Sequence, residues 1–171
     1  MAQDSGNPIV VIDTSMGTIT AELWADRAPE TVANMLAYVD DEFFDGLIFH
    51  RVISDFMIQG GGMDADMKPK ATRAPLVNEA TAELRNDRGT LAMARTSDVN
   101  SATAQFFINL MDNGFLNHQD ETVQGFGYCA FGCVTEGLDV VDLIGSVATG
   151  RSGFHDDVPI EPVVINSIRR G

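Results

Sequence analysis

The chain has 171 residues, of which 25 are Asp or Glu and 11 are Lys or Arg, giving a formal net charge of −14. A chain of this length forms about one domain, which can bury a full hydrophobic core without a metal or a disulfide. A surface this acidic repels the phosphates of nucleic acids and of anionic lipids, so we expect neither nucleic acid nor a membrane as partner. We expect a polar tail over residues 1–8 and a single domain over residues 9–171.

Eight stretches are typical of β-strands, because they are short, rich in β-branched and aromatic residues, and bounded by Gly, Asp, Asn or Pro. They are residues 9–14, 18–24, 47–52, 56–60, 90–95, 105–110, 127–135 and 160–168. Two helices are expected. Pro29 suits the first turn of one, whose apolar stripe continues to Val39. The other covers residues 137–144 and is ended by Gly145.

Many short strands with two helices predict a mainly β fold, a closed eight-stranded antiparallel β-barrel capped by two α-helices. Side chains fill so narrow a barrel, so function is expected on its outer wall. In the strand over residues 105–110, alternation leaves Gln105, Phe107 and Asn109 outside, with Phe107 as an exposed aromatic.

The long segments 61–88 and 113–126 lack periodicity and are rich in polar or small residues, so they predict loops. Loops of this length in a compact domain are usually functional. We expect both to frame a groove on the outer wall.

The cysteines and histidines indicate neither a disulfide nor a metal site. Cys129 and Cys133 are four residues apart in an expected strand, or about 13 Å. A disulfide requires Cα atoms within about 7 Å of each other. The histidines at positions 50, 118 and 155 have no ligand spacing, so we expect no metal and no cofactor.

No apolar run is long enough to span a bilayer, and the amino terminus lacks a basic stretch followed by an apolar one. We therefore expect a cytoplasmic protein. The alternative is a periplasmic or exported protein in which Met1 replaces a removed signal peptide.

Residues 49–62 carry a cation, an amide and three consecutive glycines in a strand-like apolar run. Alternation puts Met57 and Gln59 on one side, where a guanidinium from Arg51 could join them. Such a face offers fixed donors beside apolar surface but no nucleophile, which limits its chemistry to binding, orientation and electrostatics. His50 points to the opposite face, so we expect a hydrogen-bonded interior imidazole and no general base. The glycines predict a turn, since a phosphate loop would need a following Lys and Ser or Thr.

Residues 49–62 resemble a signature of the cyclophilin family of peptidyl-prolyl cis/trans isomerases. Residues 89–96 and 102–109 resemble its second and third signatures, in the right order and at the right separation. The resemblance spans about residues 9–168 and is strongest to short bacterial single-domain members, which share motifs like residues 128–131 and 149–153. It implies the same barrel and a cofactor-free isomerase that acts on proline-containing polypeptides and assists folding. We also expect a monomer.

The resemblance also implies a set of site residues. Arg51, Gln59 and Phe56 would be catalytic, with Arg51 donating a hydrogen bond to the prolyl nitrogen as the peptide bond twists. The implied substrate-binding residues line a proline pocket and the peptide edge beside it: Met57, Ala94, Arg95, Gln105, Phe107, Phe115, Leu116 and Tyr128.

Two aromatic positions depart from the best-known eukaryotic pattern. Phe115 stands in place of a tryptophan, and Tyr128 in place of a histidine. Both changes keep an aromatic wall, so we expect isomerase activity to remain. We expect weakened cyclosporin affinity, because the indole N–H donor is missing.

Two other functions compete with an enzyme. A catalytically silent binding module or holdase could use the same groove for proline peptides. A barrel carrier of a small apolar ligand would need an empty interior, which the dense Phe and Ile alternation disfavours. Arg51 and Gln59 favour the enzyme, since binding alone needs no donor to a transition state.

Overall fold

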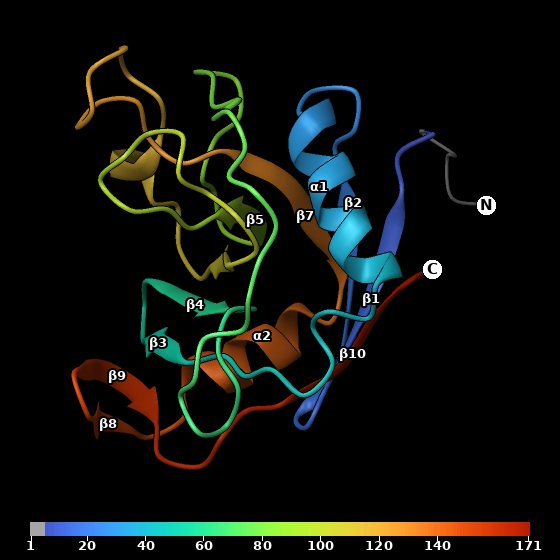
Figure 1. The fold of residues 1–171 in the computed structure, drawn as a ribbon, viewed down its shortest axis with the longest axis vertical. Helices are drawn as coiled ribbons and strands as arrows, with labels where there is room; N and C mark the ends of the chain where they lie inside the picture. Colours follow the sequence, from blue (N-terminus) through green and yellow to red (C-terminus); the bar gives the residue numbers. More distant parts are fainter. Residues whose placement is uncertain (1–5) are drawn as a thin grey trace.

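The structure is a computed structural model and describes residues 6–171, so most of the expected tail over residues 1–8 lies outside the described residues. Ten strands, two α-helices and one 3-10 turn follow one another along the chain (Figure 1). They are β1 (Ile9–Thr14), β2 (Gly17–Leu23), α1 (Pro29–Asp40), β3 (Arg51–Ile53), β4 (Met57–Gly60), β5 (Thr90–Met93), β6 (Phe106–Asn109), η1 (Gly114–Leu116), β7 (Ala130–Glu136), α2 (Leu138–Gly145), β8 (Thr149–Ser152), β9 (His155–Pro159) and β10 (Ile165–Arg170).

Eight strands form one curled antiparallel sheet in the order β10-β1-β2-β7-β5-β6-β4-β3. The predicted closed barrel is wrong, because β3 and β10 are the two edges of this sheet. The chain before β3 meets the chain before β10 only through an isolated bridge between Ile48 and Val164 and a few neighbouring backbone bonds. Pro162 has no N–H to give to a ladder, so the strand expected from residue 160 begins only at Ile165.

Residues 149–159, left without a predicted strand, form the two-stranded sheet β8-β9. Phe154 lies between these strands and is 96% exposed. Most residues of the two strands are polar or glycine and only slightly buried, so the sequence showed no period-two hydrophobic pattern here.

Both helices lie where the sequence predicts them. α1 begins at Pro29 and buries Val32, Met35, Leu36 and Val39, the predicted stripe. Glu79 from the long segment 61–88 accepts hydrogen bonds from the backbone N–H of Thr31 at 2.7 Å and from its hydroxyl at 2.6 Å. This carboxylate therefore caps the start of α1. Gly145 lies inside α2, whose C-cap is Ser146, so the predicted glycine stop is wrong by one residue.

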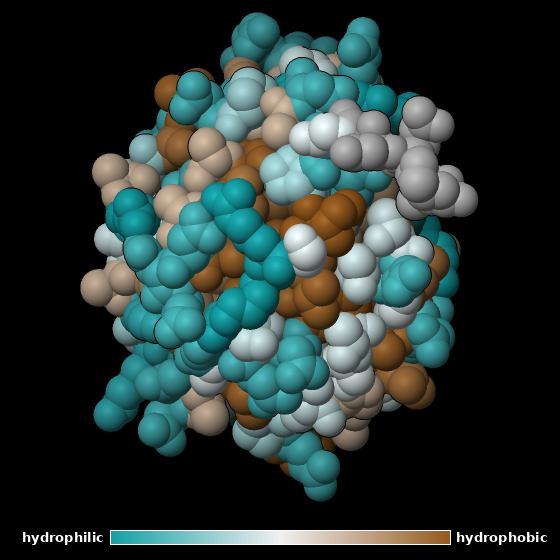
Figure 2. Space-filling model, turned by 90° about the vertical axis from the view of Figure 1, so that its right-hand side faces the viewer, coloured by the Kyte–Doolittle hydropathy of each residue, from teal (hydrophilic) through white to brown (hydrophobic). Residues whose placement is uncertain are grey.

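The core is filled by large side chains from the inner face of the sheet and from the helices. Phe44, Phe49, Phe106 and Phe131 are each at most 1% exposed. The predicted filled interior is therefore confirmed, and function must lie on the surface. Figure 2 shows the face at the right of Figure 1, where hydrophobic residues gather near the middle among hydrophilic ones.

The outer face of β6 is more deeply covered than alternation predicts. Asn109 is fully buried and bonded to Asn86 and Asn113 from two loops that pack over this strand. Phe107 is only 4% exposed, and its ring contacts that of Tyr128 with centroids 5.8 Å apart. The expectation of an exposed Phe107 is wrong. Among residues 6–171, no helix combines the length and apolar character needed to cross a membrane.

Candidate active site

A pocket of about 320 Å³ opens on the surface beside β4 and β6. It brings together every site residue implied by the sequence except Gln105. The lining residues are Arg51, Phe56, Met57, Gln59, Ala94, Arg95, Phe107, Phe115, Leu116 and Tyr128. They come from β3, β4 and the turn between them, from the segment that follows β5, from β6, and from the loop between β6 and β7 that holds η1.

The polar side of the pocket is a chain of three side chains. Arg51 lies directly across from Gln59 in the β3–β4 pairing. The Nη1 of Arg51 donates to Oε1 of Gln59 at 3.4 Å, and Nε2 of Gln59 donates to Oε1 of Gln105 at 2.9 Å. Gln105 thus lies behind the pocket and fixes the orientation of the Gln59 amide.

The three glycines that follow Gln59 leave room for this arrangement. A Cβ on Gly62 would lie 2.4 Å from Cγ of Gln105, a distance that real side chains do not tolerate. Gly61 has a φ of +90°, which favours glycine. Where a turn was predicted, Gly60 ends β4 and the chain bends at Gly61 and Gly62, and this bend makes space for a residue of the site.

The floor of the pocket is apolar and well buried. Met57 and Phe107 are 1% and 4% exposed, and Leu116 closes the floor from η1. The ring of Phe115, which is 67% exposed, stacks on Phe56 with centroids 5.7 Å apart. Such a pocket suits a compact apolar ring and excludes much of the surrounding water.

Arg95 and Tyr128 form the far wall. The guanidinium of Arg95 lies over the Tyr128 ring, 4.7 Å from its centroid. Its Nε donates to the carbonyl of Gly127 at 3.0 Å, and its Nη1 donates to the carbonyl of Thr96 at 2.9 Å. The side chain is thus held by neutral groups, and its positive charge is left for a ligand.

A buried amide network supports the pocket, and sequence reasoning missed it. Asn86 is fully buried and donates from Nδ2 to the carbonyls of Leu116 and Tyr128, at 3.2 and 3.0 Å. Asn113 donates to the carbonyl of Phe56 at 2.9 Å and to Asn109. The one available signal was Asn109, since asparagine is depleted in strands and a buried one needs partners.

The two long loops contribute differently. Residues of the segment 113–126 line the pocket, as predicted. The segment 61–88 contributes none of the lining residues and acts from behind, through Asn86 and through Glu79 at α1.

His50 lies on the opposite face from Arg51, as alternation predicts. It is 5% exposed, whereas Arg51 is exposed. Burial, followed by the charges of His155 and Arg51, lowers the pKa of His50 to about 4. Its Nδ1 has no hydrogen-bond partner in the part of the chain that the structure describes, so the expected hydrogen-bonded imidazole is wrong at this nitrogen.

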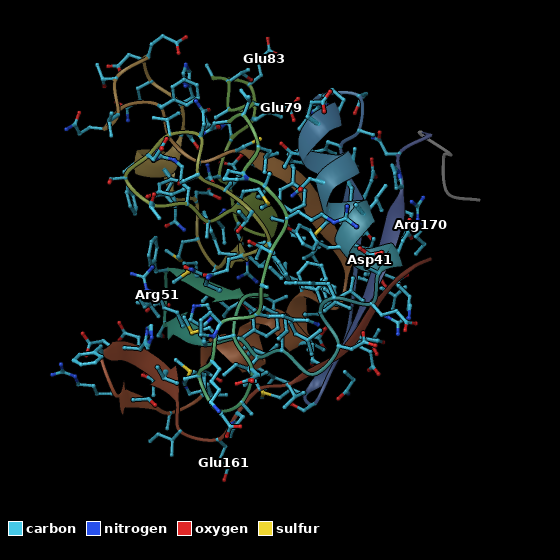
Figure 3. All side chains as sticks on the ribbon, in the orientation of Figure 1. Asp41, Arg51, Glu79, Glu83, Glu161 and Arg170 are labelled. Carbon is cyan, nitrogen blue, oxygen red and sulfur yellow. The ribbon has the colours of Figure 1, made fainter. Side chains whose placement is uncertain are left out.

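Arg51 is the exposed guanidinium at the left of Figure 3, on the other side of the molecule from Asp41 and Arg170. Among residues 6–171, no three His, Cys, Asp or Glu side chains gather so that they could hold a metal ion. Both cysteines are free, and burial raises the pKa of the Cys129 thiol to about 11. The site therefore offers hydrogen bonds, the fixed positive charges of Arg51 and Arg95, and an apolar floor.

The family model described as "Cyclophilin type peptidyl-prolyl cis-trans isomerase/CLD" matches residues 9–170. Peptidyl-prolyl cis-trans isomerase cyp18 of Streptomyces antibioticus is 60% identical over 160 residues, which cover 94% of this chain and 96% of the relative. Peptidyl-prolyl cis-trans isomerase B of Escherichia coli (strain K12) is 56% identical, with 94% and 98% covered.

Solved structures share the fold. A cyclophilin type peptidyl-prolyl cis-trans isomerase of Cryptosporidium parvum, crystallised in the presence of the dipeptide Ala-Pro, is similar with a TM-score of 0.76 and 26% identity. The match covers 95% of this chain and 98% of that one. The matched family model, the two bacterial relatives and the shared fold agree, and the chain belongs to the cyclophilin type peptidyl-prolyl cis-trans isomerases.

Proposed function

We propose that the pocket beside β4 and β6 binds the proline ring of an X-Pro segment and that Arg51 catalyses rotation about its peptide bond. The observation that carries this proposal is the position of Arg51 at the mouth of an apolar pocket, oriented through Gln59 and Gln105. The substrates are exposed X-Pro bonds of unfolded or flexible chains. The dipeptide present with the Cryptosporidium parvum relative supports proline-containing ligands.

The rate acceleration follows from differential binding. Rotation about an X-Pro bond is slow because the C–N bond has partial double-bond character, with a barrier of about 18 to 20 kcal/mol. At the twisted state the prolyl nitrogen loses its conjugation and gains a lone pair that accepts a hydrogen bond. A guanidinium held at that place stabilises the twisted state more than either planar state, so the barrier falls.

The other residues act by placing the substrate. Met57, Phe107 and Leu116 contact the proline ring, and the stacked pair Phe56 and Phe115 forms its exposed side. Gln59 and the backbone at Ala94 and Arg95 offer hydrogen bonds to an extended peptide, as in pairing with a strand edge. Removing water favours the twisted state as well, since water stabilises the polar planar amide more strongly.

A cofactor-free mechanism fits this set of groups, because bond rotation transfers no electrons and breaks no covalent bond. For the same reason a general base is not needed, and His50 stays outside the reaction. We propose that cyclosporin binds to the same pocket with weakened affinity, since Phe115 supplies an apolar ring without an N–H donor.

The test is exchange spectroscopy by NMR on a short Ala-Pro peptide. Catalytic amounts of the protein should exchange the cis and trans signals far faster than the tens to hundreds of seconds of the free peptide. Arg27→Gln is the matched control, because Arg27 is an exposed arginine that lies over the Trp24 ring, outside the pocket. Saturable binding without accelerated exchange would show a holdase and contradict the proposal.

A further inference from the structure

The charges around the pocket differ from those of the chain as a whole. Asp and Glu outnumber Lys and Arg by 25 to 11, yet none of the residues that line the pocket is acidic. The lining contains two arginines, Arg51 and Arg95. The pocket is therefore a positive site on an acidic protein.

Both arginines keep their charge unpaired among the described residues. Six other arginines lie within 4.0 Å of a carboxylate: Arg73, Arg85, Arg88, Arg151, Arg169 and Arg170. Arg51 contacts the neutral amide of Gln59, and Arg95 contacts backbone carbonyls and the Tyr128 ring. A carboxylate brought by a substrate would therefore find a cation without a competing partner.

A second hollow of about 160 Å³ adjoins the pocket and shares Gln59, Ala94 and Arg95 with it. The rest of its lining is polar and uncharged: Thr96, Ser101, Thr103 and Gln105. It too contains no acidic residue. The Ser101 hydroxyl already donates to the backbone carbonyl of Asp98 at 2.6 Å, and the Thr96 hydroxyl bonds to Ser101. The group in this lining that suits a carboxylate is therefore the guanidinium of Arg95.

The spacing of an extended peptide relates the two hollows. Side chains two residues apart point to the same face and lie about 6.6 Å from each other along the strand. If the proline ring occupies the pocket, the residue two positions away faces the adjoining hollow, whereas its immediate neighbour points away.

We propose that Arg95 selects substrates with Asp or Glu two residues from the proline, by pairing with that carboxylate in the adjoining hollow. This proposal rests on the function proposed above and names its substrate class. Arg95 is about half-buried and anchored by three carbonyls, so little side-chain entropy is lost when a carboxylate binds. The overall acidity of the chain then disfavours acidic segments everywhere except at this site.

The experiment compares peptides that carry Glu, Gln or Lys two positions before or two positions after the proline. A second set carries the same residues next to the proline. The readout is kcat/KM from NMR exchange at low and at high salt. We expect Glu to exceed Gln by about two- to fivefold at one of the two spaced positions, with Lys slowest, and the difference to shrink as salt is added.

Variants test whether Arg95 causes the preference for Glu peptides. In Arg95→Gln the Glu-to-Gln ratio should fall to about one, whatever its absolute rate, and Arg95→Lys should restore part of it. Arg27→Gln should keep the wild-type ratio, because Arg27 is an exposed arginine of the same charge outside the site. Melting curves check that each variant is folded.

Each outcome decides between the two proposals. If no peptide is isomerised, the proposed function fails. If the Gln peptides are isomerised as fast as the Glu peptides, only the selectivity by Arg95 fails. A Glu preference that survives in Arg95→Gln, or that is equal at all four peptide positions, would come from the electrostatic field of the whole protein. Either result would also overturn the selectivity by Arg95.

Discussion

Mild acid should destabilise this fold through His50. An unfolded histidine has a pKa near 6.5, and in the fold the pKa of His50 is about 4. The fold therefore favours the neutral imidazole. The stability that depends on it is complete above about pH 6.5 and is lost as the pH falls toward 4.

The size of the effect follows from the shift. About 2.5 units at 1.36 kcal/mol per unit correspond to roughly 3 kcal/mol, most of which is lost by about pH 4.5. Asp40 and Asp142 titrate below this range, because hydrogen bonds from Arg170 and Arg88 lower their pKa values from an ordinary 3.8. Neither carboxylate therefore accounts for a loss of stability between about pH 6.5 and 4.5, where His50 acts.

Urea unfolding at a series of pH values measures the loss, and His50→Leu is the informative variant. Leucine is an apolar side chain of similar size that binds no proton. The free energy of unfolding of His50→Leu should therefore change little between about pH 6.5 and 4.5. His155→Gln is the control and should keep most of the loss of stability, because burial contributes more than the His155 charge to the lowered pKa of His50. Equal losses in the wild type and in His50→Leu would refute the reasoning.

Three further predictions concern the supports of the site. Glu79→Ala removes the cap of α1 and should lower the free energy of unfolding by about 1 to 3 kcal/mol. Glu83 is an exposed neighbour labelled beside it in Figure 3, and Glu83→Ala should change this free energy by less than about 0.5 kcal/mol. Equal losses in urea unfolding would contradict the capping role. Asn86→Leu removes the side-chain donor to the Tyr128 carbonyl and one of the two donors to the Leu116 carbonyl, which still accepts from the Tyr128 N–H. Thermal unfolding should show a loss of about 1 to 3 kcal/mol, and proline-peptide binding should weaken; unchanged peptide binding would separate this network from the pocket. Phe115→Trp should bind cyclosporin a few-fold to roughly tenfold more tightly than the native chain. In the native chain the only tryptophan is Trp24, and its fluorescence should change little when cyclosporin is added. Equal affinities of the two proteins would show that Phe115 does not contact cyclosporin.

The site was more predictable than the architecture around it. Arg51, Met57 and Gln59 lie in short strands, where alternation alone decides which side chains share a face. Their convergence with Phe107 and Tyr128 required the family resemblance, because no local pattern says which strands become neighbours.

The errors of prediction have a common physical origin. Whether Asn109 and Phe107 are exposed depends on loops that are distant in sequence, and the strand pattern carries no information about them. The open edge between β3 and β10 depends on Pro162, which lies inside an otherwise strand-like run. The hairpin of β8 and β9 is formed by residues with little burial, so it lacks the hydrophobic period on which strand prediction rests.

The central claim is that Arg51 stabilises the twisted state and contributes little to binding of the planar peptide. Exchange spectroscopy and peptide titration on Arg51→Ala and Arg51→Lys test it together. We predict that Arg51→Ala folds, binds the peptide with nearly unchanged Kd, and loses about 10² to 10³ in kcat, the loss of one transition-state contact of about 2.7 to 4 kcal/mol. Arg51→Lys should recover little, because an ammonium lacks the planar fork. A folded Arg51→Ala with near wild-type kcat, or one that loses activity only through weaker binding, would contradict the account.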